Sequence, residues 1–171
     1  ELRHWLRNLH DEMQVTTVIV THDQEEAMEV ADKIVAMNHG KVEQIGTPAE
    51  IYDQPATPFV MGFIGAVNVL PQGAIGVASS DGEVAPSEAQ LFVRPHDVEV
   101  FTVQQQGTVA VELRRLTHLG RDLQAELVMA DGRVITAQIP REQMAFDSLQ
   151  PGCQLFVRSR EARSFVPDYS I

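Results

Sequence analysis

The chain has 171 residues, of which 44% are hydrophobic, and carries a formal net charge of −11. This apolar content supports one domain or two small ones and argues against wholesale disorder. Two lysines and eleven scattered arginines do not form the cationic cluster that phosphate backbones require, so we expect no nucleic-acid partner. The single cysteine, Cys153, fits a reducing compartment, and no apolar run approaches the roughly 20 residues of a membrane span.

The first elements in chain order predict an α/β arrangement. Residues 1–13 have the apolar spacing of an amphipathic helix, and because the pattern is already running at Glu1, we expect that residue to be a cut. Residues 15–21 (VTTVIVT) are β-branched and nearly all apolar, which is typical of a parallel strand covered on both faces. Asp23, with Glu26 three residues later, is a capping-box pattern that starts a helix. Helix, strand and helix in this order indicate an α/β domain.

A hairpin and two capped helices are predicted next. Residues 33–46 alternate on both sides of NHGK, so we expect a β-hairpin in which Gly40 takes a positive φ. TPAE at 47–50 supplies a cap, a proline at the first helical position and the capping-box acid. TP at 57–58 repeats the cap and the proline, and Gly65 is expected to end that helix.

From residue 66 onward, short alternating runs are separated by Gly, Asp-Gly and Pro. Many short strands at this spacing predict a small barrel or sandwich, and ADGR at 130–133 predicts a hairpin turn. We therefore place a domain boundary between an α/β part, residues 1–65, and a β-rich part, residues 66–171. The runs are QLFVRP, DVEVFTV, GTVAVELRRLTHLG, LQAELVM, RVITAQI and CQLFVRS.

His22 is the sharpest candidate for chemistry. It follows a predicted buried strand and precedes a helix start, and ligands of open α/β sheets bind beyond the carboxyl ends of the strands. An imidazole at such a place can donate a hydrogen bond to a phosphate oxygen. The alternative is a histidine that only satisfies the hydrogen bonds of a strand-to-helix turn.

The sequence around His22 resembles the end of an ABC ATPase domain. VTHDQEEA at 20–27, followed by ADKIVAMNHGKVEQIGTPAEIYDQP, is similar to that family in order, spacing and identity over residues 1–64. The resemblance implies that His22 is the switch histidine, which contacts the γ-phosphate and positions the attacking water. It also implies ATP and Mg²⁺ as cofactors, a homodimer of ATPase subunits, and transmembrane permease and periplasmic binding-protein partners. The subunit itself would lie at the cytoplasmic face of the membrane.

Other parts of an ATP site are not found in these 171 residues. No G-x-x-x-x-G-K-[ST] occurs, and Gly40-Lys41 is followed by Val42 within the predicted hairpin. Neither an LSGGQ-like signature nor an acidic strand end is present. Without backbone N–H groups and a lysine around the phosphates, we expect that the chain alone does not hydrolyse ATP and needs no cofactor.

The second part resembles the OB-like or TOBE domain of importer ATPases. VRPHD at 93–97, GTVAVELRRLTHLG and the opening LRNLHDEM are most similar to sulfate and thiosulfate importers, whereas sugar importers more usually have Arg-Pro-Glu. Arginine suits bidentate oxyanion contacts, so the candidate oxyanion ligands are Arg94, His96 and Arg121, with Arg114, Arg115 and His118 also considered. The alternative is that Arg94 fixes a strand exit and the other arginines pair with carboxylates.

Three functions remain open on the sequence alone. The leading one is the energy-coupling, ATP-hydrolysing subunit of a sulfate/thiosulfate importer, or of an importer for another substrate such as a sugar. The second is a non-enzymatic oxyanion sensor built from residues 66–171, and the third is a dimerisation platform without a ligand. The acidic residues that follow His22 are interpreted as a helix N-terminal bias and not as a metal site.

Overall fold

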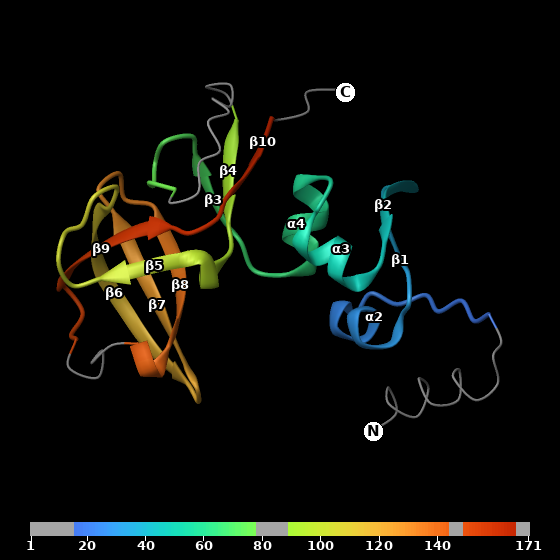
Figure 1. Cartoon of the computed structure of the whole chain (residues 1–171), viewed down its shortest axis with the longest axis horizontal. Helices are drawn as coiled ribbons and strands as arrows, with labels where there is room; N and C mark the ends of the chain where they lie inside the picture. The colour runs from blue at the N-terminus through green and yellow to red at the C-terminus, as the bar shows by residue number, and fades with distance from the viewer. Residues whose placement is uncertain (1–15, 78–88, 144–148, 167–171) are drawn as a thin grey trace. The chain divides into compact units, whose positions relative to one another are not determined.

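The computed structural model describes residues 16–77, 89–143 and 149–166 (Figure 1). The chain divides into two compact units, Glu1–Gly65 and Ala66–Ile171, and each is described by itself. Among the described residues, no helix has the length and apolar character needed to cross a membrane.

Within residues 16–65, the first unit consists of one β-hairpin and three short helices, and the helix predicted for residues 1–13 lies outside the described residues. The hairpin strands pair antiparallel with a bulge after Ala36, and both turn residues lie in the left-handed region, His39 at φ 46° and Gly40 at φ 78°. The positive φ expected at Gly40 is confirmed, while that of His39 was not predicted. The elements are α2 (Gln24–Val30), β1 (Ile34–Asn38), β2 (Lys41–Gly46), α3 (Pro48–Asp53) and α4 (Pro58–Ile64).

The predicted caps of α3 and α4 are confirmed. The Thr47 hydroxyl accepts from the Glu50 N–H at 3.3 Å, and the Glu50 carboxylate accepts from the Thr47 N–H at 2.7 Å, which completes the capping box. Thr57 accepts from the N–H of Val60 at 3.3 Å. Helix α4 ends before Gly65 as expected, but this glycine is extended at φ 176° and makes no left-handed cap.

A small core holds the first unit together. Ile51 and Val60 are fully buried between the helices and one face of the hairpin. Alternation along the strands turns the other face of the hairpin outward, where apolar side chains are exposed: Val35, Met37, Val42 and Ile45.

The predicted buried strand at 15–21 is wrong for its described part, residues 16–21. No strand is formed there, and Val18 and Val20 are 86% and 95% exposed. A parallel strand needs neighbouring strands on its edges, and no described strand lies beside this run. The parallel sheet expected for residues 1–65 is therefore not present among the described residues. The β-structure described in this unit is the antiparallel β1–β2 hairpin.

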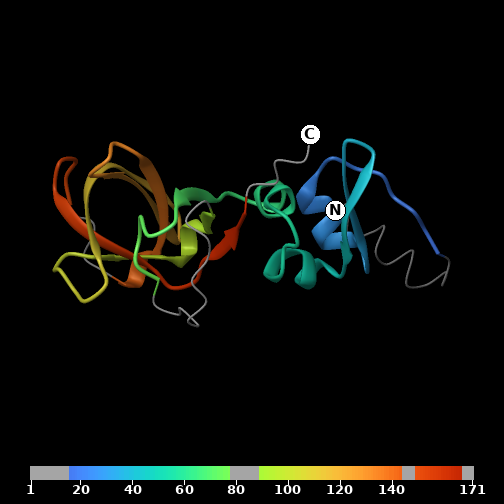
Figure 2. The same ribbon diagram turned by 90° about the horizontal axis from the view of Figure 1, so that it is seen from above.

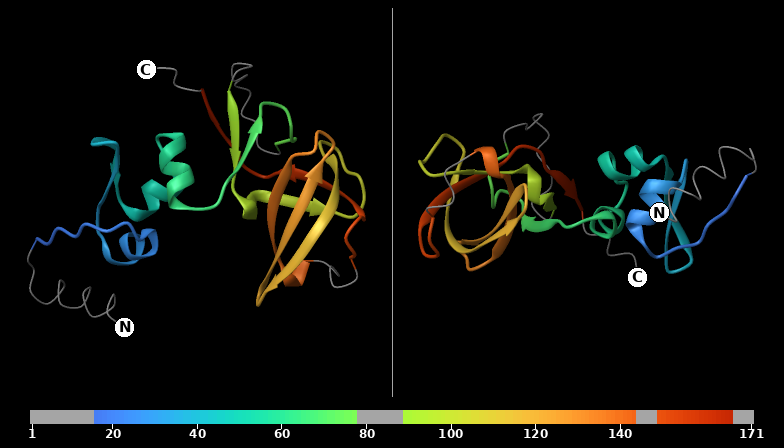
Figure 3. Two further views of the ribbon diagram at one scale, coloured as in Figure 1. Left: turned by 180° about the vertical axis from the view of Figure 1, so that it is seen from behind. Right: turned by 90° about the horizontal axis from the view of Figure 1, so that it is seen from below.

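The described part of the second unit is built almost entirely of antiparallel strands, as predicted for a β-rich part. A five-stranded sheet has the order β5-β9-β6-β7-β8, and a three-stranded sheet has the order β10-β4-β3. The larger sheet curves strongly, so that its end strands approach each other (Figures 2 and 3). The elements are β3 (Asn68–Pro71), β4 (Gln90–Val93), η1 (Pro95–Asp97), β5 (Val98–Phe101), β6 (Val109–Leu119), β7 (Asp122–Met129), β8 (Val134–Pro140), η2 (Arg141–Gln143), β9 (Gln154–Ser159) and β10 (Arg163–Phe165).

The core of the second unit lies inside this curved sheet. Alternate residues of β7 and β8 point inward, which gives burial patterns of period two. Leu113, Leu127 and Val157 are fully buried there. The predicted turn at 130–133 joins β7 to β8, with Gly132 at φ 84° and the Arg133 N–H bonded to Asp131 at 3.0 Å.

Candidate functional site

His22 lies immediately before Asp23, the N-cap of α2, and its side chain is exposed. The hydrogen bonds of this turn are made by its two neighbours. The Asp23 N–H donates to the Thr21 hydroxyl at 3.0 Å, and the Asp23 carboxylate accepts from the Glu26 N–H at 3.1 Å. Neither of these two bonds involves the imidazole, and the exposed His22 side chain is accessible to a ligand.

The three predicted oxyanion ligands are not brought together. Arg94 is 6% exposed at the start of η1, and its carbonyl accepts from the Asp97 N–H at 3.0 Å. His96 is exposed and lines a cavity. Arg121 is exposed in the turn between β6 and β7. The further candidates Arg114, Arg115 and His118 are exposed along β6.

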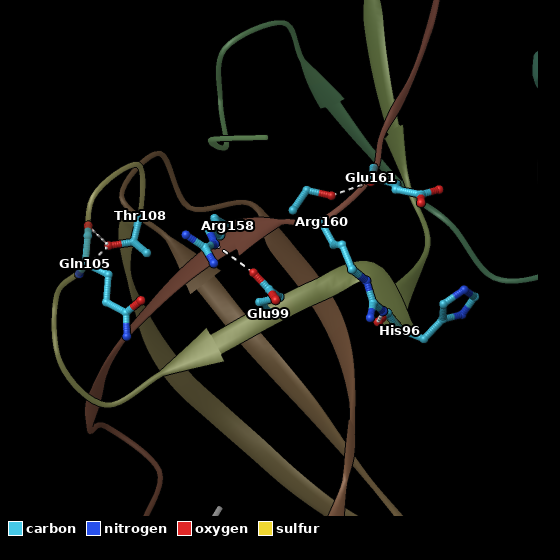
Figure 4. Close-up of polar contacts among 8 residues, drawn as sticks. His96, Glu99, Gln105, Thr108, Arg158, Arg160 and Glu161 are labelled. Atoms are coloured by element: carbon cyan, nitrogen blue, oxygen red, sulfur yellow. Dashed lines mark hydrogen bonds and ion pairs between the residues drawn. The ribbon is translucent and has the colours of Figure 1, made fainter. Parts of the chain in front are cut away.

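A cavity of about 480 Å³ lies between β5 and β8, the two end strands of the larger sheet. A small ionic cluster of Arg160, Asp97 and His96 lies at this cavity, and Figure 4 shows the contact of Arg160 with His96. The Arg160 guanidinium donates to the carbonyl of His96 at 2.9 Å and to the Asp97 carboxylate at 3.5 Å. The other Asp97 oxygen is 3.7 Å from Nε2 of His96. These contacts tie β9 and the loop after it to η1.

Glu99 and Arg158 form a second ion pair beside this cavity. They are direct cross-strand partners on β5 and β9, and their side chains meet at 2.7 Å (Figure 4). Arg158 also lies over the ring of Phe101, 5.2 Å from its centroid, which adds a cation–π contact. Arg158 thus contacts two side chains of β5, those of Glu99 and Phe101.

The sequence analysis missed the charged residues in or beside this cavity, which are Glu99, Asp122, Arg158 and Arg160. A signal was available, because Arg158 lies in a predicted strand and Arg160 is two residues further on, a spacing at which side chains share a face. What the sequence did not provide was the pairing of β5 with β9, since these strands are separated by more than fifty residues. Among the described residues, no group of His, Cys, Asp or Glu has the arrangement of a metal site.

The comparisons concern the whole chain. It is 56% identical over 171 residues to the sulfate/thiosulfate import ATP-binding protein CysA of Synechococcus elongatus and 52% identical to that of Thermosynechococcus vestitus. All of this chain is covered, with 49% and 50% of those proteins. The corresponding Synechocystis protein is 47% identical over 97% of the chain. The chain belongs with the sulfate/thiosulfate import ATP-binding proteins.

The chain spans about half the length of the curated relatives it matches, so the comparison concerns that half of those proteins. No protein-family model matches the chain. A solved structure of the cytoplasmic molybdate-binding protein ModG, with molybdate bound, aligns with 46% of this chain and with 62% of the ModG chain. The TM-score is 0.41 and the sequence identity is 16%. A likeness at that level supports no argument about this chain.

Proposed function

We propose that the chain is part of the ATP-hydrolysing, energy-coupling subunit of a sulfate/thiosulfate importer. The observation that carries this proposal is identity above 50% along all 171 residues with two proteins named for sulfate/thiosulfate import and ATP binding. Identity at that level over two structurally different units favours a shared role of both units over a shared single motif.

Within this role, His22 contacts the γ-phosphate of ATP. Its exposure supports the proposal, because the imidazole is available for a ligand, and the two hydrogen bonds of the adjoining turn do not involve it. A donor aimed at the transferred phosphoryl group stabilises charge that develops in the transition state. ATP and Mg²⁺ would be held mainly by residues of the longer protein, and two such subunits would close on two nucleotides.

Residues 66–171 are proposed to be the OB-like accessory domain of this subunit. The strongly curved, five-stranded antiparallel sheet supports this assignment, since an OB fold is a five-stranded, partly open barrel. The partners of the subunit would be membrane-embedded permeases and a periplasmic binding protein. The subunit itself would lie at the cytoplasmic face of the membrane.

A chimera tests the role of the chain and of His22. The 171 residues replace the matching half of the Synechococcus elongatus relative, and ATP hydrolysis and sulfate uptake are measured. We expect an active chimera, and we expect His22→Ala to lower the hydrolysis rate by about 100-fold while ATP still binds. His118→Ala, which removes an exposed histidine from the other unit, serves as the control and should leave both activities unchanged.

Two results would contradict the proposal. An inactive chimera that is folded and binds ATP would remove the assignment to an import ATPase, and equal activities of the His22 and His118 variants would remove the role of His22. The isolated 171-residue chain is expected to show no ATP hydrolysis under the same conditions, because it contains no phosphate loop.

A further inference from the structure

A smaller cavity, of about 230 Å³, lies on the outer face of the larger sheet beside the start of β3. We propose that it binds a small uncharged molecule that carries a carboxamide on an apolar body. Its volume suits a ligand of roughly ten non-hydrogen atoms, smaller than a drug-sized molecule. The cavity has no part in the proposed contact with ATP, so the inference stands apart from the proposed function.

The floor of this smaller cavity follows from the alternation of β7 and β8. Gln124 and Gln138 are direct cross-strand partners, and because their neighbours along each strand are buried on the inner face, both amides lie on the outer face. One wall is the segment that enters β3, where Asn68 bonds both backbone groups of Thr136 at 2.7 and 2.8 Å. The strand pairing and these two bonds fix the cavity before a ligand binds, which lowers the entropic cost of binding.

The lining of the smaller cavity favours a ligand without charge. Of the described residues, those that line it include no acid, no base and no histidine. A charged ligand would therefore lose part of its hydration without gaining a partner of opposite charge. The Asp122 carboxylate does not line this cavity, and it accepts from the Gln138 amide at 2.8 Å. Its negative charge behind that amide disfavours an anion further.

Side-chain amides supply the hydrogen-bonding groups. Gln124 is half-buried, and its amide makes no hydrogen bond within the part of the chain that the structure describes. A carboxamide presents a donor and an acceptor side by side, and a second amide is the uncharged group that satisfies both at once. After its bond to Asp122, Gln138 retains a carbonyl oxygen and one N–H, and Thr136 adds a hydroxyl.

The remaining walls are apolar. Val67, Pro95 and Leu119 line this part of the cavity, and Leu119 is 54% exposed. A ligand that covers these side chains removes apolar surface from water, so the carboxamide is expected on an apolar ring or chain. Benzamide, a ring that carries one carboxamide, has both features.

The probe is benzamide, titrated into the 171-residue chain and followed by two-dimensional amide NMR that includes the side-chain amides. We expect saturable shifts at Leu119, Gln124 and Gln138, with a dissociation constant on the order of 1 mM for so small a ligand. Absence of saturable shifts at about 10 mM benzamide would overturn the proposal. Saturable shifts confined to residues outside the cavity would overturn it too.

Three compounds of the same shape separate the features of the probe. Acetophenone keeps the carbonyl and lacks the N–H donors, benzoate is an anion without donors, and benzamidine is a cation without an acceptor. We expect each to bind at least about fivefold more weakly than benzamide. Equal binding of acetophenone would overturn the recognition of an amide, and equal binding of benzoate or benzamidine would overturn the preference for an uncharged ligand.

A matched pair of protein variants tests the location. Gln124→Met keeps the length of the side chain and removes its amide, and we expect it to weaken benzamide binding about fivefold. Gln154→Met makes the same exchange at an exposed position of β9 outside the cavity, and it should leave binding unchanged. Equal binding by the two variants would overturn the site. Should Gln124→Met fold poorly, the comparison of the four compounds on the parent chain still decides the proposal.

Discussion

Asn68 fills a place on the edge of β8 that a peptide group of a further strand would occupy. Its amide is 9% exposed and bonds both backbone groups of Thr136, which is 68 residues away in the chain. We expect Asn68→Leu to lower the free energy of unfolding by about 2–3 kcal/mol, because two partly buried backbone groups of Thr136 would lose their partners. Urea denaturation measures the loss. Asn38→Leu, which removes only a 3.3 Å contact with Glu43, is the control and should cost clearly less.

Gly76 is the second residue whose identity is fixed by its surroundings. A Cβ atom added there would collide with the carbonyl oxygen of Gly107, and the Gly76 carbonyl is already bonded to the Ser159 N–H. We expect Gly76→Ala to destabilise the chain by about 1–3 kcal/mol through this overlap. Gly132→Ala is the comparison, since its Cβ meets nothing and it loses only the ease of a positive φ. A smaller loss at Gly76 than at Gly132 would contradict the steric argument.

Local signals predicted single residues well only where the cause lies within a few positions. Thr47, Thr57 and Gly40 were predicted because caps and turns depend on their immediate neighbours. Asn68 gave no signal, because its partner lies on a strand far away in the sequence. His39 was missed for a different reason, since a hairpin turn of this kind needs a positive φ at both central residues and glycine marks only one of them.

The capping box of α3 makes the stability of this helix depend on pH. The backbone N–H of Thr47 first, and its hydroxyl second, hold the pKa of Glu50 below its ordinary value of 4.5. A carboxyl group whose pKa is lowered by folding stabilises the folded state above its unfolded pKa, and this stabilisation is lost as the pH falls through the folded pKa. We expect Glu50→Gln to reduce the acid-induced loss of stability below about pH 4.5, measured by thermal unfolding from pH 3 to 7. An unchanged pH profile in this variant would contradict the assignment.

Elements were predictable to the extent that their hydrogen bonds are local. The hairpin of β1 and β2 and the capped helices α3 and α4 formed as expected, since a turn or a cap specifies each one. Residues 16–21 have the composition of a strand, but composition supplies no partner, and a strand forms only beside another strand. For the same reason the alternating runs of the second part were recognisable as strands, while the order β5-β9-β6-β7-β8 was not.

The exposed apolar surface of the first unit favours self-association of the chain in solution. Val18 and Val20 are almost fully exposed in a β-branched run outside any described sheet, and the outward face of the hairpin is apolar as well. Such a run is a template for pairing between chains, and the net charge of −11 opposes that association at low salt. We therefore expect the isolated 171-residue chain to self-associate, and to do so more strongly as salt screens the charge.

Sedimentation velocity at low and high salt measures this association. A variant with both Val18→Asp and Val20→Asp should remain monomeric at concentrations where the parent chain associates, because two charges on the run disfavour pairing between chains. Val103→Asp places a charge at a valine that is 70% exposed in the second unit, and it should associate like the parent. A parent chain that stays monomeric at high salt would show that the exposed run does not drive association. Equal suppression by Val103→Asp would show that net charge, and not this run, controls it.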